Sequence, residues 1–368
     1  MRLLLLSHQE MDFLGATITV GAYENGHEVY EWPYVRHLHG GTDDDYILAD
    51  GKQGLTGPPG FMRNPLPENY HTDEEILDLM PTFDFIIAHS TRDYAMRALR
   101  KVIDRLGHMP TNLILAEGED HDNIDQALIE HCRPLVFFKR ELVRQGLEPF
   151  DPHRYVDGTP VWPLQFGAFT RSYDGLDIND QEKDFDLFLA LGITYMPRNA
   201  LLGAFLSYGV EHGLSHYIAT NHDSPIRARH PYADKLRGML DWSRYIRAQA
   251  WSKITASMRG YGRDTLHAWE AFSFNTFVLY ADPGLYIPHP FKNNIHCIHF
   301  DERACKDISV LLDFWLHENS KDRREMIAAA GKARCWYYHS TQARFKYALA
   351  IAQTYQEGRE PDPEQYEL

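Results

Sequence analysis

Short apolar runs alternate with helical segments along most of the 368 residues, and this rhythm limits the folds open to the chain. The run RLLLLS (residues 2–7) precedes a predicted helix over 14–25, which Gly26 ends, and the run HEVYEW (27–32) follows. Strands buried on both faces of a parallel sheet read as such continuous apolar runs. Further runs FDFIIAH, NLILA and LVFFK follow at 83–89, 112–116 and 135–139. The first part of the chain is therefore predicted to form βαβ units around a parallel sheet.

A second βα series follows a change in composition. Residues 147–183 are rich in Pro, Asp, Gly and aromatic side chains, lack sustained periodicity, and are predicted to connect two domains. Beyond them we expect strands at 184–191, 215–220, 253–257 and 277–280, and helices at 198–212, 232–240 and within 308–356. Doubly wound domains bind ligands at the carboxyl ends of their strands, so a cleft between the two domains is the expected site.

Charge, cysteine spacing and the lengths of the apolar runs disfavour several classes of protein. The net charge of −15 disfavours broad binding to a nucleic-acid backbone. Four cysteines without a CxxC pair indicate reduced thiols, and no metal site is predicted. No apolar run reaches the length of a membrane span or signal peptide, so a cytoplasmic protein is expected. The absence of GxGxxG after the first strand disfavours a dinucleotide dehydrogenase.

The stretch GYGRDTLHAWEAFSFNTFVLYAD (260–282) carries the strongest chemical signal. Gly260 and Gly262 permit close backbone approach, and Asp264 or Thr265 is a suitable N-cap for a helix ending near residue 274. Free amides at a helix start attract phosphate. Glu270 follows where a carboxylate could accept hydrogen bonds from the two hydroxyls of a ribose. The alternative is a plain helix with a solvated glutamate.

The second half resembles the nucleotide-binding half of GT-B glycosyltransferases. The motifs are SK at 252–253, GxGRDT at 260–265, WEA at 269–271 and RREMIAAAGKA at 323–333, and the family they resemble most is the spore-maturation-protein (CgeB-like) glycosyltransferases. The resemblance implies two Rossmann-like doubly wound domains facing across a cleft, an acceptor-side domain at 1–165 and a nucleotide-sugar domain at 180–345. Residues 346–368 would form a helix and tail that cross back to the first domain.

The resemblance also implies a set of donor contacts. It places Glu270 on the ribose and cations near the leaving diphosphate. The implied donor-binding residues are Arg198, Lys253, Gly262, Arg263, Asp264, Thr265 and Glu270. His267 and Asn275 depart from the arginine and glycine of many relatives, which leaves the phosphate contacts and the following turn open.

The implied activity is metal-independent transfer of a sugar from a UDP-, GDP- or dTDP-linked donor to a hydroxyl of a glycan, small molecule or protein, without another cofactor. A general base would come from strand ends of the first domain, where His8, Asp12 and Asp120 are the candidates, beside Glu10, His89, Glu117 and Glu119. Acids at strand ends also cap helices, which is the competing interpretation.

Three other functions stay open at this point. One is a nucleotide-sugar epimerase or phosphorylase of the same fold. Another is a glycosyltransferase acting on hydroxymethylated DNA bases, which the acidic charge disfavours. The last is a non-catalytic sugar-nucleotide binder.

Overall fold

The chain divides into two compact units in the computed structural model, and each is described by itself. The structure describes residues 1–8, 12–39, 64–144, 146, 148–176, 178, 183–220, 224–238, 240–303, 305 and 307–368. The first unit contains Met1–Ser172, Leu285–Pro290 and Tyr338–Leu368, and the second contains Tyr173–Gly284 and Phe291–Tyr337. The first unit is therefore assembled from three separate pieces of the sequence.

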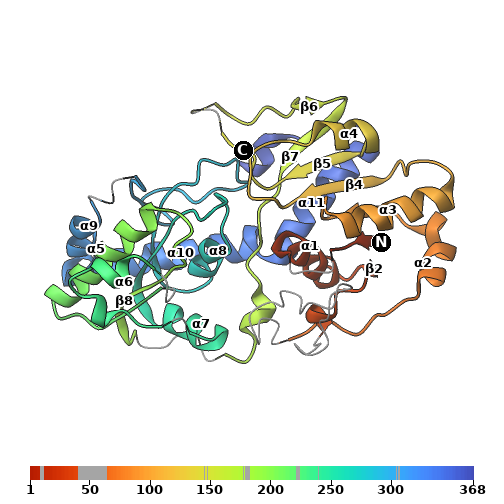
Figure 1. Cartoon of the computed structure of the whole chain (residues 1–368). Helices are drawn as coiled ribbons and strands as arrows, with labels where there is room; N and C mark the ends of the chain where they lie inside the picture. The colour runs from red at the N-terminus through yellow and green to blue at the C-terminus, as the bar shows by residue number, and fades with distance from the viewer. Residues whose placement is uncertain are drawn as a thin grey trace. The chain divides into compact units, whose positions relative to one another are not determined.

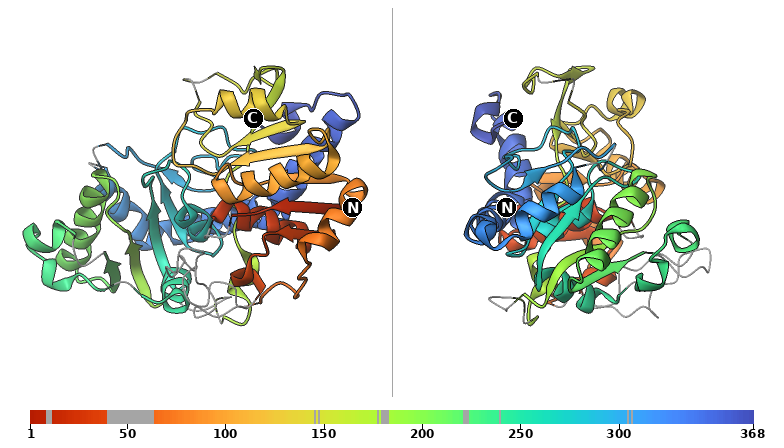
Figure 2. Two further views of the ribbon diagram at one scale, coloured as in Figure 1. Left: turned by 45° about the vertical axis from the view of Figure 1, so that its right-hand side comes forward. Right: turned by 90° about the vertical axis from the view of Figure 1, so that its left-hand side faces the viewer.

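The first unit is built on a seven-stranded sheet with the order β2-β1-β3-β4-β5-β7-β6 (Figure 2). Its strands are β1 (Arg2–Leu6), β2 (Glu28–Trp32), β3 (Phe85–Ala88), β4 (Leu113–Glu117), β5 (Val136–Lys139), β6 (Tyr155–Val156) and β7 (Thr159–Pro163). All pairs are parallel except the edge pair of β6 with β7. The strand order reverses between β1 and β3, so the loops after these two strands form the switch point of the sheet.

Helices cover this sheet, and two of them pack closely on each other. The helices are α1 (Phe13–Glu24), α2 (Asp73–Leu79), α3 (Asp93–Leu106), α4 (Gln126–Cys132) and α11 (Thr341–Gln356). Figure 1 shows α11, in blue, beside α1, in dark red. A Cβ on Gly21 of α1 would lie 2.4 Å from the carbonyl oxygen of Thr341, so only glycine permits this approach. Asn25 and Glu24 add hydrogen bonds to Gln342 and Thr341.

The second unit has a five-stranded parallel sheet with the order β12-β11-β10-β8-β9. Its strands are β8 (Phe185–Ala190), β9 (His216–Ala219), β10 (Ser252–Ser257), β11 (Phe277–Tyr280) and β12 (Ile298–His299). Its helices are α5 (Pro197–Glu211), α6 (Ile226–Arg229), α7 (Trp242–Ala250), α8 (Leu266–Phe272), α9 (Ile308–Leu316) and α10 (Lys321–His339), the last of which ends in the first unit. The switch point lies between β8 and β10.

The predicted fold class is confirmed: both units are sheets covered by helices, parallel except for the edge pair of β6 with β7, and the long helix α11 belongs to the first unit. Two local predictions are wrong. The described residues of 232–240 form no α-helix but only a 3₁₀ turn at Ala233–Lys235, since Arg237 bridges to Ala219 and the next α-helix begins only after Asp241, whose carboxylate caps it through Arg244 N. The segment 147–183 contains β6 and β7, because the run TPVWP pairs with β5.

Candidate functional site

The glycine turn lies at the switch point of the second sheet. It follows β10, precedes α8, and is closed by a hydrogen bond from Gly260 N to Gly262 O of 2.9 Å. A Cβ on Gly260 would lie 3.1 Å from Arg198 Nη2 and 3.2 Å from Thr194 Oγ1, so any larger residue here would push these two side chains outward by a few tenths of an ångström. The predicted order of strand, glycine turn, helix and strand is present. The backbone of this turn is therefore held where doubly wound sheets bind ligands.

Arg198 joins the two loops of this switch point. From α5 it donates Nε to Arg259 O at 2.8 Å, Nη1 to Gly192 O at 2.8 Å and Nη2 to Met258 O at 3.1 Å. Only 7% of the residue is exposed, and burial lowers the pKa of its guanidinium to about 10. Three carbonyl oxygens thus fix the arginine as the support of the glycine turn.

Glu270 is buried in α8 beside a tyrosine. It is 4% exposed and accepts a 2.7 Å hydrogen bond from Tyr245 Oη of α7. Burial raises the pKa of the carboxyl to about 7, although the hydrogen bond from Tyr245 favours the ionised form. The glutamate is therefore not solvated on a helix surface, and its charge is sensitive to pH near neutrality.

His267 stands where many relatives of the resembled family carry an arginine. Its two ring nitrogens are buried, and no described residue hydrogen-bonds to either of them. Burial, with the nearby charge of Arg198, lowers the pKa of the imidazole to about 3. The side chain is consequently neutral at physiological pH and adds no positive charge to this site.

The start of α8 differs from the prediction. The helix runs only from Leu266 to Phe272, so its dipole is small. Thr265 is the N-cap, but its side chain makes no capping hydrogen bond. Asp264 instead accepts a 2.8 Å hydrogen bond from the indole Nε1 of Trp269. Arg263 donates a 3.0 Å hydrogen bond to Pro283 O. The first contact holds the turn against α8, and the second holds it against the loop that follows β11.

Lys253 lies at the other edge of the sheet. It is the second residue of β10, whereas the glycine turn follows the last residue of the same strand. Its ammonium group pairs with Asp186 at 2.7 Å, near the amino end of β8. This corrects the expectation that Lys253 lies beside the leaving diphosphate, because strand direction places it at the amino edge.

The switch point of the first sheet gathers imidazoles and a carboxylate. Ser7 Oγ and His89 Nε2 are 2.9 Å apart, and burial lowers the pKa of His89 to about 4. His8, Asp12 and His89 line one cavity of about 10 Å³, room for a single water at most. Asp12 caps α1 by accepting 2.9 Å from Leu14 N, as the competing interpretation expects. Glu10 lies outside the described residues.

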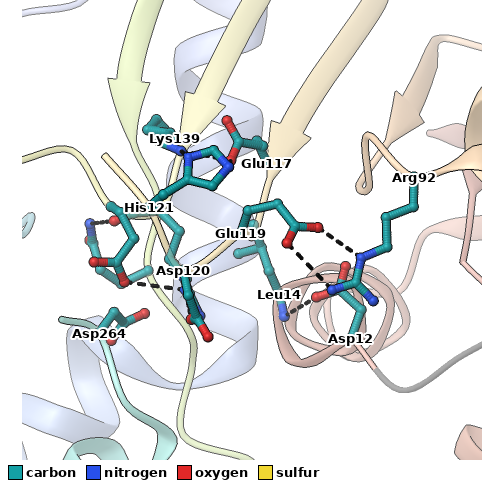
Figure 3. Close-up of polar contacts among 12 residues, drawn as sticks. Asp12, Leu14, Arg92, Glu117, Glu119, Asp120, His121, Lys139 and Asp264 are labelled. Atoms are coloured by element: carbon teal, nitrogen blue, oxygen red, sulfur yellow. Dashed lines mark hydrogen bonds and ion pairs between the residues drawn. The ribbon is translucent and has the colours of Figure 1, made fainter. Parts of the chain in front are cut away.

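A buried ion pair follows on the same edge. Lys139, at the end of β5, donates 2.6 Å to Glu117, at the end of β4, and both side chains are almost fully buried (Figure 3). Lys139 Nζ lies 3.5 Å from Nδ1 of His121, whose Nε2 is 3.9 Å from Glu117. His121 is half exposed, so this pair presents an imidazole to solvent. Neither Lys139 nor His121 is among the site residues predicted from the sequence.

The remaining acids of this edge are paired with arginines. Asp120 forms an ion pair with Arg140, which also lies 3.2 Å from Glu141. Glu119 accepts 2.7 Å from Arg92 Nε, as Figure 3 shows. The sequence does contain a signal for two of the ion pairs at this edge. Lys139 and Arg140 stand at the end of the apolar run of β5, and the acidic segment that pairs with them begins at the end of the neighbouring strand β4.

Within the described residues, no group of three or more His, Cys, Asp or Glu side chains is arranged to hold a metal ion. No helix there is long and apolar enough to cross a membrane.

Comparison with known proteins rests on structure. No family model and no curated protein matches the sequence. A glycosyltransferase from Rickettsia africae is similar with a TM-score of 0.59 and 14% identity over 97% of this chain and 98% of that one. HepE from Anabaena, solved with UDP-glucose, is similar with a TM-score of 0.55 and 8% identity over 96% of this chain and 99% of that one. An alpha-glucosyltransferase solved with UDP-glucose and DNA containing an abasic site is similar with a TM-score of 0.56 and 14% identity over 95% of this chain and 98% of that one. At these identities the likeness concerns the fold, and the chain has the GT-B fold.

Proposed function

We propose that the protein transfers a sugar from a nucleotide-diphosphate sugar to an acceptor hydroxyl. The observation that carries the proposal is a glycine turn followed by a buried glutamate at the switch point of the second sheet of a GT-B fold. Structures of similar fold, HepE and the alpha-glucosyltransferase, are described with UDP-glucose bound, which supports a donor of this class.

In this proposal the second unit binds the nucleotide. Glu270 accepts hydrogen bonds from the ribose hydroxyls, while the backbone at Gly262 and Thr265 and the guanidinium of Arg263 contact the diphosphate. Breaking the sugar–phosphate bond develops negative charge on this diphosphate, and fixed amides and cations stabilise such charge. Arg198 acts by holding the turn, since three carbonyl oxygens already engage it.

The acceptor is activated from the first unit, and Asp12 is our candidate for the general base. Burial raises the pKa of its carboxyl above the ordinary value, toward the range in which a base is effective. His8 lines the same small cavity and is the second candidate. Asp120 ranks below both, because Arg140 already pairs with it.

The proposal has two further parts. The protein is related to the CgeB-like glycosyltransferases, and its activity requires no metal ion. An assay in excess EDTA tests the second point: full turnover supports it, and loss of turnover that Mg²⁺ restores contradicts it.

A nucleotide screen tests the proposal as a whole. Melting temperature is measured with UDP, GDP, dTDP and CDP and with their sugar conjugates. A ligand that binds only the folded state at 100 times its Kd adds about 2.7 kcal/mol of stability. We expect one nucleoside diphosphate and its sugar conjugate to raise the melting temperature more than the other three.

Product analysis then separates the reaction classes. Incubation with the stabilising sugar nucleotide alone should give little conversion, and addition of an acceptor should release the nucleoside diphosphate. Conversion of the donor without any acceptor would favour the epimerase, and no stabilisation by any of the nucleotides at millimolar concentration would contradict donor binding.

A further inference from the structure

A large charged cavity lies at the amino edge of the second sheet, away from the glycine turn. Its volume is about 570 Å³, within the range of small-molecule sites. It lies where β10 and β11 begin and beside the first turns of α10. It is lined by Lys183, Lys253, Asn275, Phe277, Glu318, Lys321, Arg324, Glu325, Ala328 and Ala329.

Positive charge predominates in this cavity. Four of its side chains are cations and two are carboxylates, in a chain whose net charge is −15. Asp186 neutralises Lys253 at 2.7 Å. Within the described part of the chain, no carboxylate lies within ion-pair distance of Lys183, Lys321 or Arg324. Three cations thus line one cavity without an ion-pair partner among the described residues, and the nearby charges of Glu318 and Glu325 offset them only in part.

Two of these cations are held in place by backbone oxygens. Lys183 Nζ donates to Ala250 O at 2.5 Å, and Arg324 Nη1 donates to Trp315 O at 2.5 Å. Arg324 is 5% exposed. Burial, with repulsion from Lys332, lowers the pKa of Lys183 to about 8. Partial burial of these two cations costs free energy, as the lowered pKa of each shows, and a bound anion would offset that cost.

We propose that this cavity binds a small phosphate ester that also carries hydroxyl groups, such as a sugar phosphate. The phosphate would contact Lys183, Lys321 and Arg324, because cations form strong charge-assisted hydrogen bonds with phosphate oxygens. Carboxylates accept hydrogen bonds from hydroxyls, and Glu318 and Glu325 supply them on the same wall.

This second site does not depend on the donor assignment. The glycine turn follows the last residue of β10, whereas the cavity surrounds the start of that strand, so the two ligands do not compete for the same residues. Asn275, where the chain departs from the glycine of many relatives, lines this cavity. The site gives the unit a means of sensing a phosphorylated metabolite.

Lysine NMR of the full chain tests the proposal directly. Reductive ¹³C-methylation labels every lysine while keeping its charge, and single Lys→Gln variants assign the signals of Lys183, Lys253, Lys321 and Lys235. Glucose 6-phosphate, inorganic phosphate and glucose are titrated at constant ionic strength. We expect glucose 6-phosphate and phosphate to shift the three cavity signals with a common Kd, glucose 6-phosphate more tightly, and glucose to shift none of them.

Variants provide the quantitative check. Lys321 is exposed, so Lys321→Gln should fold normally and weaken glucose 6-phosphate binding about tenfold or more, the scale of one charge-assisted hydrogen bond. Lys235→Gln is the matched control, since Lys235 is an exposed lysine outside the cavity and should leave binding unchanged. Equal shifts of all lysines, no shift at millimolar ligand, or unchanged affinity in Lys321→Gln would overturn the proposal.

Discussion

Glu270 is a buried carboxylate whose proposed contact with a ribose requires it to be charged, although burial favours its neutral form. A folded-state pKa of about 7, above the ordinary 4.5, means that the folded protein binds this proton more tightly than the unfolded chain does. Protonated Glu270 therefore contributes its full stabilisation of the folded state below pH 4.5, the ordinary pKa of the group. This contribution is lost as the pH rises through about 7, the folded-state pKa.

Replacing the charge should separate stability from binding. Glu270→Gln keeps an oxygen for Tyr245 but carries no charge, so we expect the free energy of unfolding to rise by about 3 kcal/mol at pH 8 and to change little near pH 4.5. Affinity for the preferred nucleotide should fall by about 1 kcal/mol or more. Urea unfolding at the two pH values and isothermal titration measure the two effects.

The matched control is Glu211→Gln, because Glu211 also accepts a hydrogen bond from a tyrosine, Tyr232, but at the surface. It should change neither quantity. Unchanged nucleotide affinity in Glu270→Gln would remove the ribose assignment while leaving the pH effect on stability intact.

Asp12 allows a similar separation of capping from catalysis. Asparagine also caps helices, so Asp12→Asn should retain the hydrogen bond to Leu14 N and the melting temperature. Loss of a general base lowers turnover by about 10²–10⁴-fold, with little change in donor affinity. Steady-state kinetics and donor titration on the same preparation provide the comparison.

Asp125→Asn serves as its control, because Asp125 caps α4 through Leu128 N in the same way and should keep full turnover. Turnover of Asp12→Asn within a few-fold of the unchanged protein would reduce Asp12 to a helix cap and leave His8 and the half-exposed His121 as the next variants to make.

At the level of elements, the contact of α1 with α11 depends on a single missing methyl group. In Gly21→Ala the new Cβ would meet the backbone oxygen of Thr341, which cannot rotate away. Alanine favours a helix by about 1 kcal/mol over glycine, but overpacking costs about 1–3 kcal/mol, and a clash with backbone lies at the upper end. We expect a net loss of stability and a lower melting temperature.

Gly238→Ala is the control for this substitution, since nothing lies within 4 Å of a Cβ at that position. It should leave the melting temperature unchanged. A gain of stability in Gly21→Ala would mean that α11 shifts readily on α1, contrary to the close packing described here.

Elements with a strong local pattern could be predicted from the sequence, and those set by distant partners could not. The apolar runs of β1, β3, β4 and β11 indicate buried strands on their own. By contrast, β7 forms because TPVWP pairs with β5, and the segment around Arg237 pairs with β9, so their surroundings override local preference.

The same distinction applies to the site. The glycine turn and Glu270 are adjacent in sequence and were found together, whereas their supports come from elsewhere. Tyr245 of α7 reaches Glu270, and Arg198 of α5 reaches the turn, contacts that no spacing in the sequence encodes. The motif alone does not place Lys253 at the correct edge, because a motif gives proximity along the chain but not the direction in which its strand runs.

At the scale of the whole molecule, charge limits the acceptor more than the fold does. One protein of similar fold is described with DNA, yet this chain carries 52 acidic and 37 basic side chains. Binding along a nucleic-acid backbone relies on many lysine and arginine contacts with phosphate. The overall charge therefore favours a small or glycan acceptor within the proposed activity.

The return of α11 to the first unit also bears on how the polypeptide is made. Residues Leu14 to Ala22 of α1 are buried without interruption, and α11, which packs on them, is synthesised more than 300 residues later. Until then the nascent chain exposes an apolar helix, and the contacts that cover it span more than 300 positions, the kind of separation that slows folding. The second unit, whose strands all precede residue 300, has its sheet complete before the first unit can close.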